Sequence, residues 1–374
     1  MRIAAVTARA LQARPARPVT FAGGFWDAYS CVLVEVHTDE GVVGYGEAIA
    51  RAAPQMAKAV VESLLAPVVV GQDPRNIGGL WTQMVQALRR FGHARGLVME
   101  AISGVDVALW DLVGKLEGRP ISQLLYGAGR TEVPVYASSV YIDDPEVMCQ
   151  QAKEQVDAGF TMVKVKIGRG RGREDRRRDI DALRAIRDTV GPSIELFTDA
   201  NSAYDAATAI RVAREFEDID IGWLEEPVPP DDLAGYARIH EMTSIPLARG
   251  ETDFGMFDFT EVVNRRLVDV LQPDLGRCGG VTPARQLSEL AFHANLDFAP
   301  HTGFSGGISH LVALHVGAAA PALAAVEYMF IDIPLKHIFA EPFPRAVDGV
   351  VTLPTGPGLG LDLDWDAIDR FTLA

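Results

Sequence analysis

Cysteine is scarce in this sequence. The 374 residues contain three cysteines, Cys31, Cys149 and Cys278, which lie far apart and match no metal-binding spacing. We therefore expect reduced, structural thiols and no disulfide framework. Long apolar runs are also lacking: the most apolar stretch, residues 311–326, is shorter than a membrane span and is interrupted by a histidine and a proline. It predicts a buried helix leading into a strand, not a membrane anchor.

Positive charge is in deficit, with 35 lysines and arginines against 50 aspartates and glutamates and a net charge of −15. Neither nucleic acid nor an anionic membrane would attract such a chain, so we expect neither as a partner. A small anionic substrate stays open, because a metal ion and a few lysines can invert the local field. Arg9 and Arg14 interrupt the N-terminal stretch before a signal-peptide core forms, which predicts a soluble, cytoplasmic protein.

The first part of the chain carries the signals of antiparallel strands followed by helices. Residues 30–48 predict a hairpin that turns at the sequence TDEG. Residues 54–125 have helical periodicity, and the helix predicted over 98–118 ends at a glycine. Strands followed by helices predict a separate α+β unit, which we place at residues 1–128.

Beyond about residue 133 the pattern changes to short apolar strands that alternate with helical segments. Eight such strands predict an α/β fold of the (β/α)8 barrel type, which we place at residues 129–335. A doubly wound open sheet is the alternative, but no G-x-G-x-x-G follows an early strand, which argues against a dinucleotide site. The tail, residues 336–374, is rich in proline and glycine, and we expect it to fold back as a hairpin on the first domain. The basic stretch 168–178 predicts a solvated loop.

Polar side chains stand at the ends of the predicted barrel strands, where the chemistry of such barrels lies. From the second strand to the eighth they are Lys164 and Lys166, Asp199 and Asn201, Glu225 and Glu226, Glu251, Asp274, His301 and Glu327. The gaps from Asp199 to Glu327 are 26, 26, 23, 27 and 26 residues, which is the length of one strand and one helix. We therefore expect these groups to converge on one mouth of the barrel.

Three of these carboxylates, Asp199, Glu225 and Glu251, would repel one another unless a cation neutralised them. An all-oxygen set suits Mg²⁺ and leaves positions for water and substrate oxygens. For Glu226 we expect a supporting role behind the ligands or in a salt bridge.

His301 and Asp274 end adjacent strands, so a hydrogen bond between them is expected to fix the imidazole tautomer and raise its basicity. The second and seventh strands face each other across the mouth. Lys166 and His301 would then address opposite faces of a bound substrate, and Lys164 could bind a carboxylate oxygen.

The motifs KVK, TDAN, WLEEP, RGE, QPD, PHTG and EY occur in this order and resemble those of the enolase superfamily, in its mandelate racemase branch. The resemblance covers nearly the whole chain. It implies a modified (β/α)7β barrel, whose last strand lacks its helix, with an N-terminal capping domain on which residues 336–374 pack. Relatives of this branch are commonly homo-oligomers, which implies the same here.

The resemblance also implies roles for the strand-end residues. These are one Mg²⁺ per subunit on Asp199, Glu225 and Glu251; Lys166 and the His301–Asp274 pair as acid/base catalysts; Glu327 and Lys164 on the substrate carboxylate; and Asn201 near the α-hydroxyl. The common step is removal of the proton α to a carboxylate of a small molecule, through an enediolate.

The fate of that intermediate distinguishes the candidate reactions. Loss of a β-hydroxyl converts an aldonate or aldarate to a 2-keto-3-deoxy acid, and we favour this dehydration because acid-sugar dehydratases share the lysine and Asp/His pattern. The alternative is a racemase or epimerase of a 2-hydroxy acid. Muconate cycloisomerases and dipeptide epimerases carry a lysine on the sixth barrel strand, which VDVLQPDLGR lacks. A non-catalytic ligand-binding relative should have lost one of the bases or metal carboxylates, and none is missing.

The segment 18–29, PVTFAGGFWDAY, is expected to close over the substrate. Phe21 and Trp26 are candidate substrate-binding residues, either packed on the barrel rim or, for Trp26, in contact with a less polar or cationic substrate. Arg51 and Arg95 could hold a distal carboxylate or form surface ion pairs.

Overall fold

Alternating apolar residues near the N-terminus build an antiparallel sheet. The computed structural model describes residues 1–126 and 129–373. In it, β1 (Ile3–Ala13), β4 (Tyr29–Thr38) and β5 (Val43–Ile49) form a sheet in the order β1-β4-β5. The turn between β4 and β5 confirms the hairpin predicted over 30–48. A smaller hairpin, β2 (Val19–Phe21) with β3 (Gly24–Trp26), interrupts the chain between β1 and β4.

Helices follow this sheet in the chain. They are α1 (Pro54–Val60), a π-helical turn (Val61–Leu65), α2 (Ala66–Val69), α3 (Ile77–Arg89), α4 (Leu97–Glu117) and α5 (Ile121–Tyr126). Of these, α1, α2 and α4 pack on the sheet. The long helix α4 lies directly on β5, where a Cβ added to Gly46 would come 2.0 Å from a carbonyl oxygen of α4. It ends at Gly118, whose left-handed φ of 65° is one that glycine adopts at no steric cost. This confirms the helix predicted over 98–118.

The rest of the chain forms the barrel. Its strands are β6 (Glu132–Val140), β7 (Met162–Lys166), β8 (Glu195–Asp199), β9 (Ile221–Glu225), β10 (Leu247–Arg249), β11 (Val270–Leu271), β12 (Asp297–Phe298) and β13 (Val326–Met329). Neighbours from β6 to β12 pair in parallel, and β13 pairs with β6. The sheet closes between β12 and β13, where the Ala324 amide donates to the Phe298 carbonyl at 3.0 Å.

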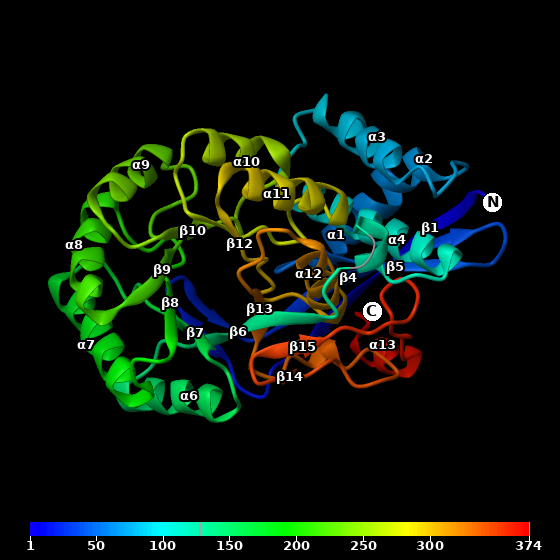
Figure 1. The fold of residues 1–374 in the computed structure, drawn as a ribbon. Coiled ribbons are helices and arrows are strands. Elements are labelled where there is room, and N and C mark those ends of the chain that lie inside the picture. Colours follow the sequence, from blue (N-terminus) through cyan, green and yellow to red (C-terminus); the bar gives the residue numbers. More distant parts are fainter. Residues whose placement is uncertain (127–128, 374) are drawn as a thin grey trace.

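A helix follows each of the first seven barrel strands and forms part of an outer ring (Figure 1). These helices are α6 (Pro145–Asp157), α7 (Arg173–Val190), α8 (Ala206–Phe216), α9 (Leu233–Met242), α10 (Gly255–Asn264), α11 (Val281–Ala294) and α12 (Gly307–Ala319). After β13 the described chain continues into a 3₁₀ turn, Pro334–Lys336, instead of a helix. The prediction of a modified (β/α)7β barrel with an N-terminal capping domain is confirmed.

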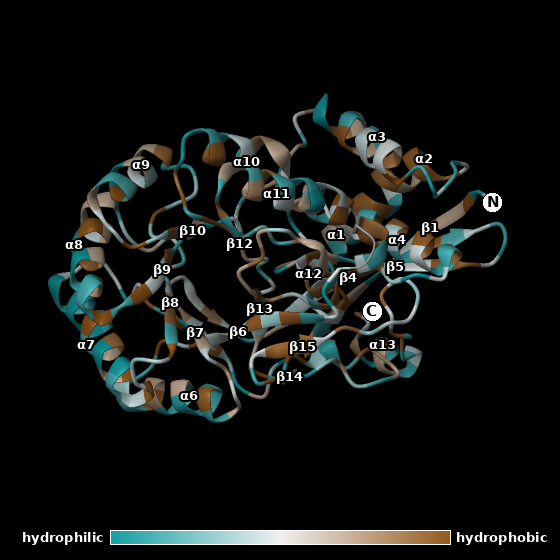
Figure 2. Cartoon of the chain, viewed as in Figure 1, coloured by the Kyte–Doolittle hydropathy of each residue, from teal (hydrophilic) through white to brown (hydrophobic). Residues whose placement is uncertain are grey.

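Helix α7 corrects one expectation. It begins at Arg173, so the second half of the basic stretch 168–178 is helical and not a loop. Arginine is a good helix former, and Glu174 and Asp175 stabilise the first turn. Figure 2 shows α7 as largely hydrophilic, with apolar residues such as Leu183 buried.

Side chains inside the barrel are layered because a strand turns alternate residues to the same face. The floor consists of Tyr136, Phe197 and Trp223 with smaller residues of the other strands, and the rings of Phe197 and Trp223 are stacked. Asp199 and Glu225 therefore stand one level above these two rings. The layer of charged side chains thus lies directly above a layer of aromatic side chains.

The C-terminal tail divides between the two parts of the molecule. The hairpin β14 (Ala346–Val347) and β15 (Val350–Thr352) pairs with β6 of the barrel, so the expectation that it lies against the first domain is wrong. The last helix, α13 (Trp365–Phe371), contacts β1, and the Leu373 amide donates to the Ala10 carbonyl at 2.8 Å. The boundary expected at residue 128 lies outside the described residues. Within 1–126 and 129–373, no helix is both long and apolar enough to cross a membrane.

Candidate active site

The two lysines of β7 point into the barrel. Because β7 lies between β6 and β8, it is a central strand, and Lys164 and Lys166 are only 0% and 4% exposed. Lys164 Nζ lies 2.8 Å from Glu225 Oε1 and 2.7 Å from Glu327 Oε1. Burial lowers the pKa of Lys164, but the charges of these two carboxylates outweigh it and hold the pKa well above its usual value. Lys166 pairs with Asp199 on the next strand. Two carboxylates thus neutralise the Lys164 ammonium, and Asp199 neutralises that of Lys166.

The three predicted metal ligands lie on consecutive strands. Asp199 and Glu225 are register partners on β8 and β9, and Glu251 follows β10. Glu225 accepts from Gln272 Nε2 at 2.8 Å as well as from Lys164. Burial, reinforced by the charge of Asp199, raises the pKa of Glu225 to about 7. All three carboxylates are buried at the mouth of the barrel.

His301 and Asp274 form the predicted pair. Nδ1 of the imidazole is 2.7 Å from Asp274 Oδ2, and the other ring nitrogen, Nε2, is 2.8 Å from Glu251 Oε2 and 3.4 Å from Glu327 Oε2. Burial lowers the pKa of His301, but the charges of Glu327 and Glu251 outweigh it and raise the pKa to about 10. Nε2 is therefore the ring nitrogen that faces the carboxylate cluster.

Glu327 and Asn201 complete the cluster. Glu327 Oε2 accepts the Thr302 backbone N–H at 2.7 Å, and burial, which raises its pKa, is outweighed by His301 and Lys164, so the pKa is lowered. Asn201 Nδ2 lies 3.2 Å from Glu251 Oε1, whereas Asn201 Oδ1 is buried without a hydrogen-bond partner among the described residues.

Glu226 has a different environment from the neighbouring Glu225. It accepts a hydrogen bond from Thr252 Oγ1, and the described residues give it no salt bridge. Burial, with the adjacent charge of Glu251, raises the pKa of Glu226 to about 8. Of the two roles expected for it, only that of a residue behind the ligands agrees with this geometry.

Aromatic side chains of the β2–β3 hairpin pack against the loop that carries His301. The ring of Trp26, from β3, lies 5.1 Å from that of Phe304 and 6.0 Å from that of Phe21. Phe304 belongs to the loop after β12 that carries His301, so the hairpin β2–β3 rests on this loop. Phe21 and Trp26 are thus brought to the mouth, and their contact with substrate stays a prediction.

The sequence analysis left the role of Arg51 open and did not identify Gln272 as a residue of the site. Arg51 donates to Glu251 Oε2 at 2.9 Å, while Arg95 pairs with Asp258 away from the cluster. Gln272 precedes Asp274 by two residues, and this spacing on a buried strand was the signal that could have identified it. The contact of Arg51 had no such signal, because it joins residues 200 positions apart.

The residues present fit a divalent cation by charge. Six buried carboxylates (Asp199, Glu225, Glu226, Glu251, Asp274 and Glu327) lie among three basic side chains and one imidazole. Negative charge is in surplus even when the imidazole is protonated. The unpartnered oxygen of Asn201 adds a neutral oxygen donor, the kind that Mg²⁺ accepts.

The carboxylates are oriented by basic groups in this structure. No three His, Cys, Asp or Glu side chains of the described residues are already arranged around one point as metal ligands. Asp199, Glu225 and Glu251 point instead at Lys166, Lys164 and His301. Ligation would exchange these ion pairs for metal–oxygen contacts.

Comparison with known protein families agrees with this architecture. Residues 147–367 match the model described as enolase C-terminal domain-like, and residues 4–126 match that of the mandelate racemase / muconate lactonizing enzyme N-terminal domain. This chain belongs to the enolase superfamily. The first region covers the barrel from α6 onward and most of the C-terminal tail, and the second covers the capping sheet with its helices.

Individual members of the superfamily resemble the chain over most of its length. The D-galactarolactone cycloisomerase of Agrobacterium fabrum is 35% identical, covering 100% of this chain and 99% of that enzyme. The arabinonate dehydratase of Saccharolobus solfataricus is 34% identical over 88% of this chain and 87% of that enzyme. A crystal structure of a racemase from Streptomyces coelicolor A3(2) with bound magnesium has a TM-score of 0.90 at 29% identity, covering 99% of this chain and 100% of that one.

Proposed function

We propose that this protein is a Mg²⁺-dependent hydro-lyase that dehydrates an acid sugar to a 2-keto-3-deoxy acid. The observation that carries the proposal is the convergence of Lys166 and the His301–Asp274 pair on one buried carboxylate cluster. Two groups able to move protons then flank the same small volume. The relative named arabinonate dehydratase supports this choice of reaction.

In the proposed reaction, one base takes the proton from the carbon α to the substrate carboxylate. Lys164 and Glu327, whose charged groups lie 2.7 Å apart, hold the substrate carboxylate through charge and hydrogen bonding. Mg²⁺ held by Asp199, Glu225 and Glu251 would stabilise the negative charge that develops on the carboxylate oxygens. The electron pair of the broken C–H bond then expels the β-hydroxyl, which leaves as water after protonation by His301 Nε2, and the enol product rearranges to the 2-keto acid.

A second candidate is a cycloisomerase of an acid-sugar lactone, supported by the relative of that name. The α-proton is removed in the same way, but the departing oxygen belongs to a ring in the same molecule. Product mass separates the candidates: dehydration yields a keto acid lighter by one water, cycloisomerisation yields a keto acid of unchanged mass, and racemisation yields no keto group.

The test incubates a panel of aldonates, aldarates and their lactones with the enzyme and Mg²⁺ in D₂O. We expect α-deuterium and a keto product from the wild type, and loss of both in Lys166→Met and His301→Asn. Lys115→Met removes a comparable lysine–aspartate pair from the capping domain and should retain turnover. If no acid of the panel exchanges its α-proton, the proposed function is wrong.

Three properties complete the proposal. We expect one Mg²⁺ per subunit, a homo-oligomeric assembly and a cytoplasmic location. Metal analysis of the purified protein tests the first and light scattering during gel filtration tests the second.

A further inference from the structure

Two helices of the barrel, α11 and α12, begin after glycines that have no side chain to cap them. The residues before their first turns are Gly280 and Gly306. By contrast, α8 and α9 are capped by their own Asp205 and Asp232, each of which accepts a backbone N–H of the first turn. The first N–H groups of a helix need acceptors, so those of α11 and α12 depend on other parts of the molecule.

Glu47, on β5 of the capping domain, caps α12. Its Oε1 accepts the Gly306 N–H at 2.6 Å, and its Oε2 accepts the N–H groups of Ile308 at 3.1 Å and Ser309 at 3.3 Å. Burial raises the pKa of Glu47 to about 7, and these three N–H groups oppose the rise. A Cβ on Gly306 would come 2.7 Å from Oε2, so the glycine is what allows the carboxylate to approach.

Asp106, on α4 of the capping domain, has the same role at α11. Its Oδ2 accepts the Thr282 N–H at 2.9 Å, and its Oδ1 accepts the Thr282 hydroxyl at 2.6 Å. A Cβ on Gly280 would clash with this carboxylate, as at α12. The neighbouring Gly279 N–H donates to Ser103 Oγ, also on α4, at 3.0 Å. Both helices are thus capped by buried carboxylates of the capping domain.

The loops that lead into these two helices carry the His301–Asp274 pair. Residues 275–280 join Asp274 to α11, and residues 302–306 join His301 to α12. In the second loop Phe304 has a left-handed φ of 63°, which a bulky residue keeps only where the surrounding structure holds it. Release of either loop would therefore shift one member of the pair relative to the other.

The loop after Lys166 is held differently. The N–H groups of Gly168 and Arg169 both donate to Asp179 Oδ2 at 3.1 Å, and Asp179 belongs to α7, the helix that follows in the barrel. The support of Lys166 is therefore part of the barrel itself, whereas that of the imidazole and its aspartate comes from the capping domain.

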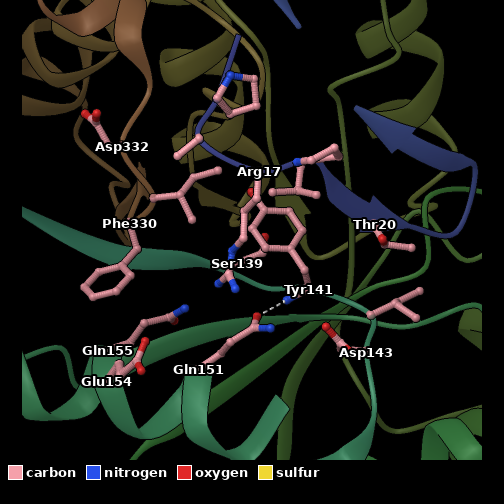
Figure 3. Close-up of a pocket in the computed structure, with 16 residues that line it drawn as sticks. Arg17, Thr20, Ser139, Tyr141, Asp143, Gln151, Glu154, Gln155, Phe330 and Asp332 are labelled. Carbon is pink, nitrogen blue, oxygen red and sulfur yellow. Dashed lines mark hydrogen bonds between the residues drawn. The ribbon is translucent and has the colours of Figure 1, made fainter. Parts of the chain in front are cut away.

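The capping domain and the barrel do not meet so closely along the whole rim. Where residues 15–20 face α6, they leave a hollow of about 280 Å³. Figure 3 shows Arg17 on the capping-domain side of this hollow and Glu154 of α6 across from it. None of the described residues that line it belongs to either capped loop. The carboxylates at α11 and α12 are therefore specific attachments and not a consequence of uniform close packing.

We propose that Glu47 and Asp106 are positioning residues, through which the capping domain holds the His301–Asp274 pair in place for proton transfer. They act through the two loops and do not touch the substrate. The inference rests on the proposed function, because it presumes that this pair transfers a proton.

The test compares Glu47→Gln and Asp106→Asn with wild type on the best acid of the panel. Each change keeps the shape of the side chain but replaces one accepting oxygen by a donor. We expect kcat to fall about 10–100-fold, as for a displacement of about 1 Å at a reacting group. KM should stay within about twofold of wild type, because Lys164 and Glu327 still hold the substrate carboxylate.

Hydrogen exchange followed by mass spectrometry needs no substrate and reports on the loops directly. Amide exchange should become faster over residues 302–310 in Glu47→Gln and over residues 275–284 in Asp106→Asn. Glu47→Asp, which keeps the charge on a shorter side chain, should lose less kcat than Glu47→Gln.

Asp111→Asn is the matched control. Asp111 is another buried carboxylate of α4, and it accepts the N–H groups of Tyr45 and Leu359 at 2.8 Å each, which belong to neither loop. This variant should keep the kcat of wild type, whatever its effect on Tm.

Three results would overturn the inference while leaving the proposed function standing. They are a kcat within about twofold of wild type in Glu47→Gln and Asp106→Asn, a loss confined to KM, and an equal loss of kcat in Asp111→Asn. A wild type that turns over none of the acids would reject the proposed function, and this inference with it.

Discussion

His301 Nδ1 lies 2.7 Å from Asp274 Oδ2, although the two residues are 27 positions apart in the chain. Adjacent parallel strands bring them together, and the contact directs Nε2 of the imidazole at Glu251 and Glu327. A carboxylate on one ring nitrogen fixes which nitrogen is available for proton transfer. We therefore expect proton transfer at His301 to depend on Asp274.

Asp274→Asn should reduce α-proton exchange by roughly 10²–10⁴-fold, the usual contribution of a general acid or base. The amide can no longer hold the imidazole in the same tautomer, whereas the shape of the side chain is kept. Rates of deuterium incorporation measure the effect, and a thermal melt checks that the variant is folded. A rate of exchange within about twofold of wild type would contradict the proposal that the His301–Asp274 pair transfers the proton.

Mg²⁺ should stabilise the folded protein because it binds the assembled carboxylates and not the unfolded chain. At 100 times its dissociation constant the gain is about 2.7 kcal/mol, which appears as a rise in Tm. Glu225→Gln should remove most of this rise. Glu62→Gln, the same change at an ion pair with Lys58 in the capping domain, should keep it. An unaltered Mg²⁺-dependent rise in Glu225→Gln would exclude Glu225 as a ligand.

Trp26→Ala should raise KM severalfold, because each aromatic pair that holds the β2–β3 hairpin over the site contributes about 0.5–1.5 kcal/mol. Phe25→Ala is the matched control: Phe25 is the neighbouring residue of the same strand and is 66% exposed. The hairpin should become more sensitive to limited proteolysis in Trp26→Ala only. Equal KM values for the two variants would argue against a roof role for Trp26.

His315, buried in α12, should make the free energy of unfolding depend on pH. Its Nε2 lies 3.0 Å from the Leu359 carbonyl, and burial lowers the pKa of His315 from 6.5 to about 4. The unfolded chain then binds more protons between pH 4 and 6.5, so this contribution is present above pH 6.5 and is lost as the pH falls toward 4. At 1.36 kcal/mol per pH unit the loss is about 3 kcal/mol.

His315→Gln keeps a nitrogen donor for Leu359 but cannot take up this proton. Denaturant unfolding at several pH values should therefore give a difference between wild type and His315→Gln that changes across pH 4–6.5. Taking the difference removes the contributions of buried carboxyls common to both proteins. A difference that is constant over this range would contradict a buried, neutral His315.

Much of the candidate active site could be predicted because strand ends recur at regular intervals. One polar group per strand, spaced by the length of a strand and a helix, places Asp199, Glu225 and Glu251 on neighbouring strands whatever the details of packing. The alternation of apolar residues likewise predicted the hairpin over 30–48 and the barrel itself. These features depend on local periodicity, which a sequence carries directly.

Features that depend on contacts between distant segments were harder to predict from the sequence. The ion pair of Arg51 with Glu251 joins the capping domain to the barrel. The β14–β15 hairpin pairs with β6. A high content of proline and glycine predicts turns but does not indicate which strand a hairpin will pair with. The helix of Arg173–Arg178 was missed for another reason, because a run of arginines suits a solvated loop as well as a solvated helix face.

By itself, the sequence determined the kind of barrel, the identity of the acid/base and metal-ligand candidates, and their common height at the strand ends, since all of these follow from a repeating period. Only the tertiary structure decided which charges neutralise Lys164 and Lys166, and where the β2–β3 hairpin rests. Such relationships arise where separate segments meet, and the distances between their atoms exist only once the chain has folded.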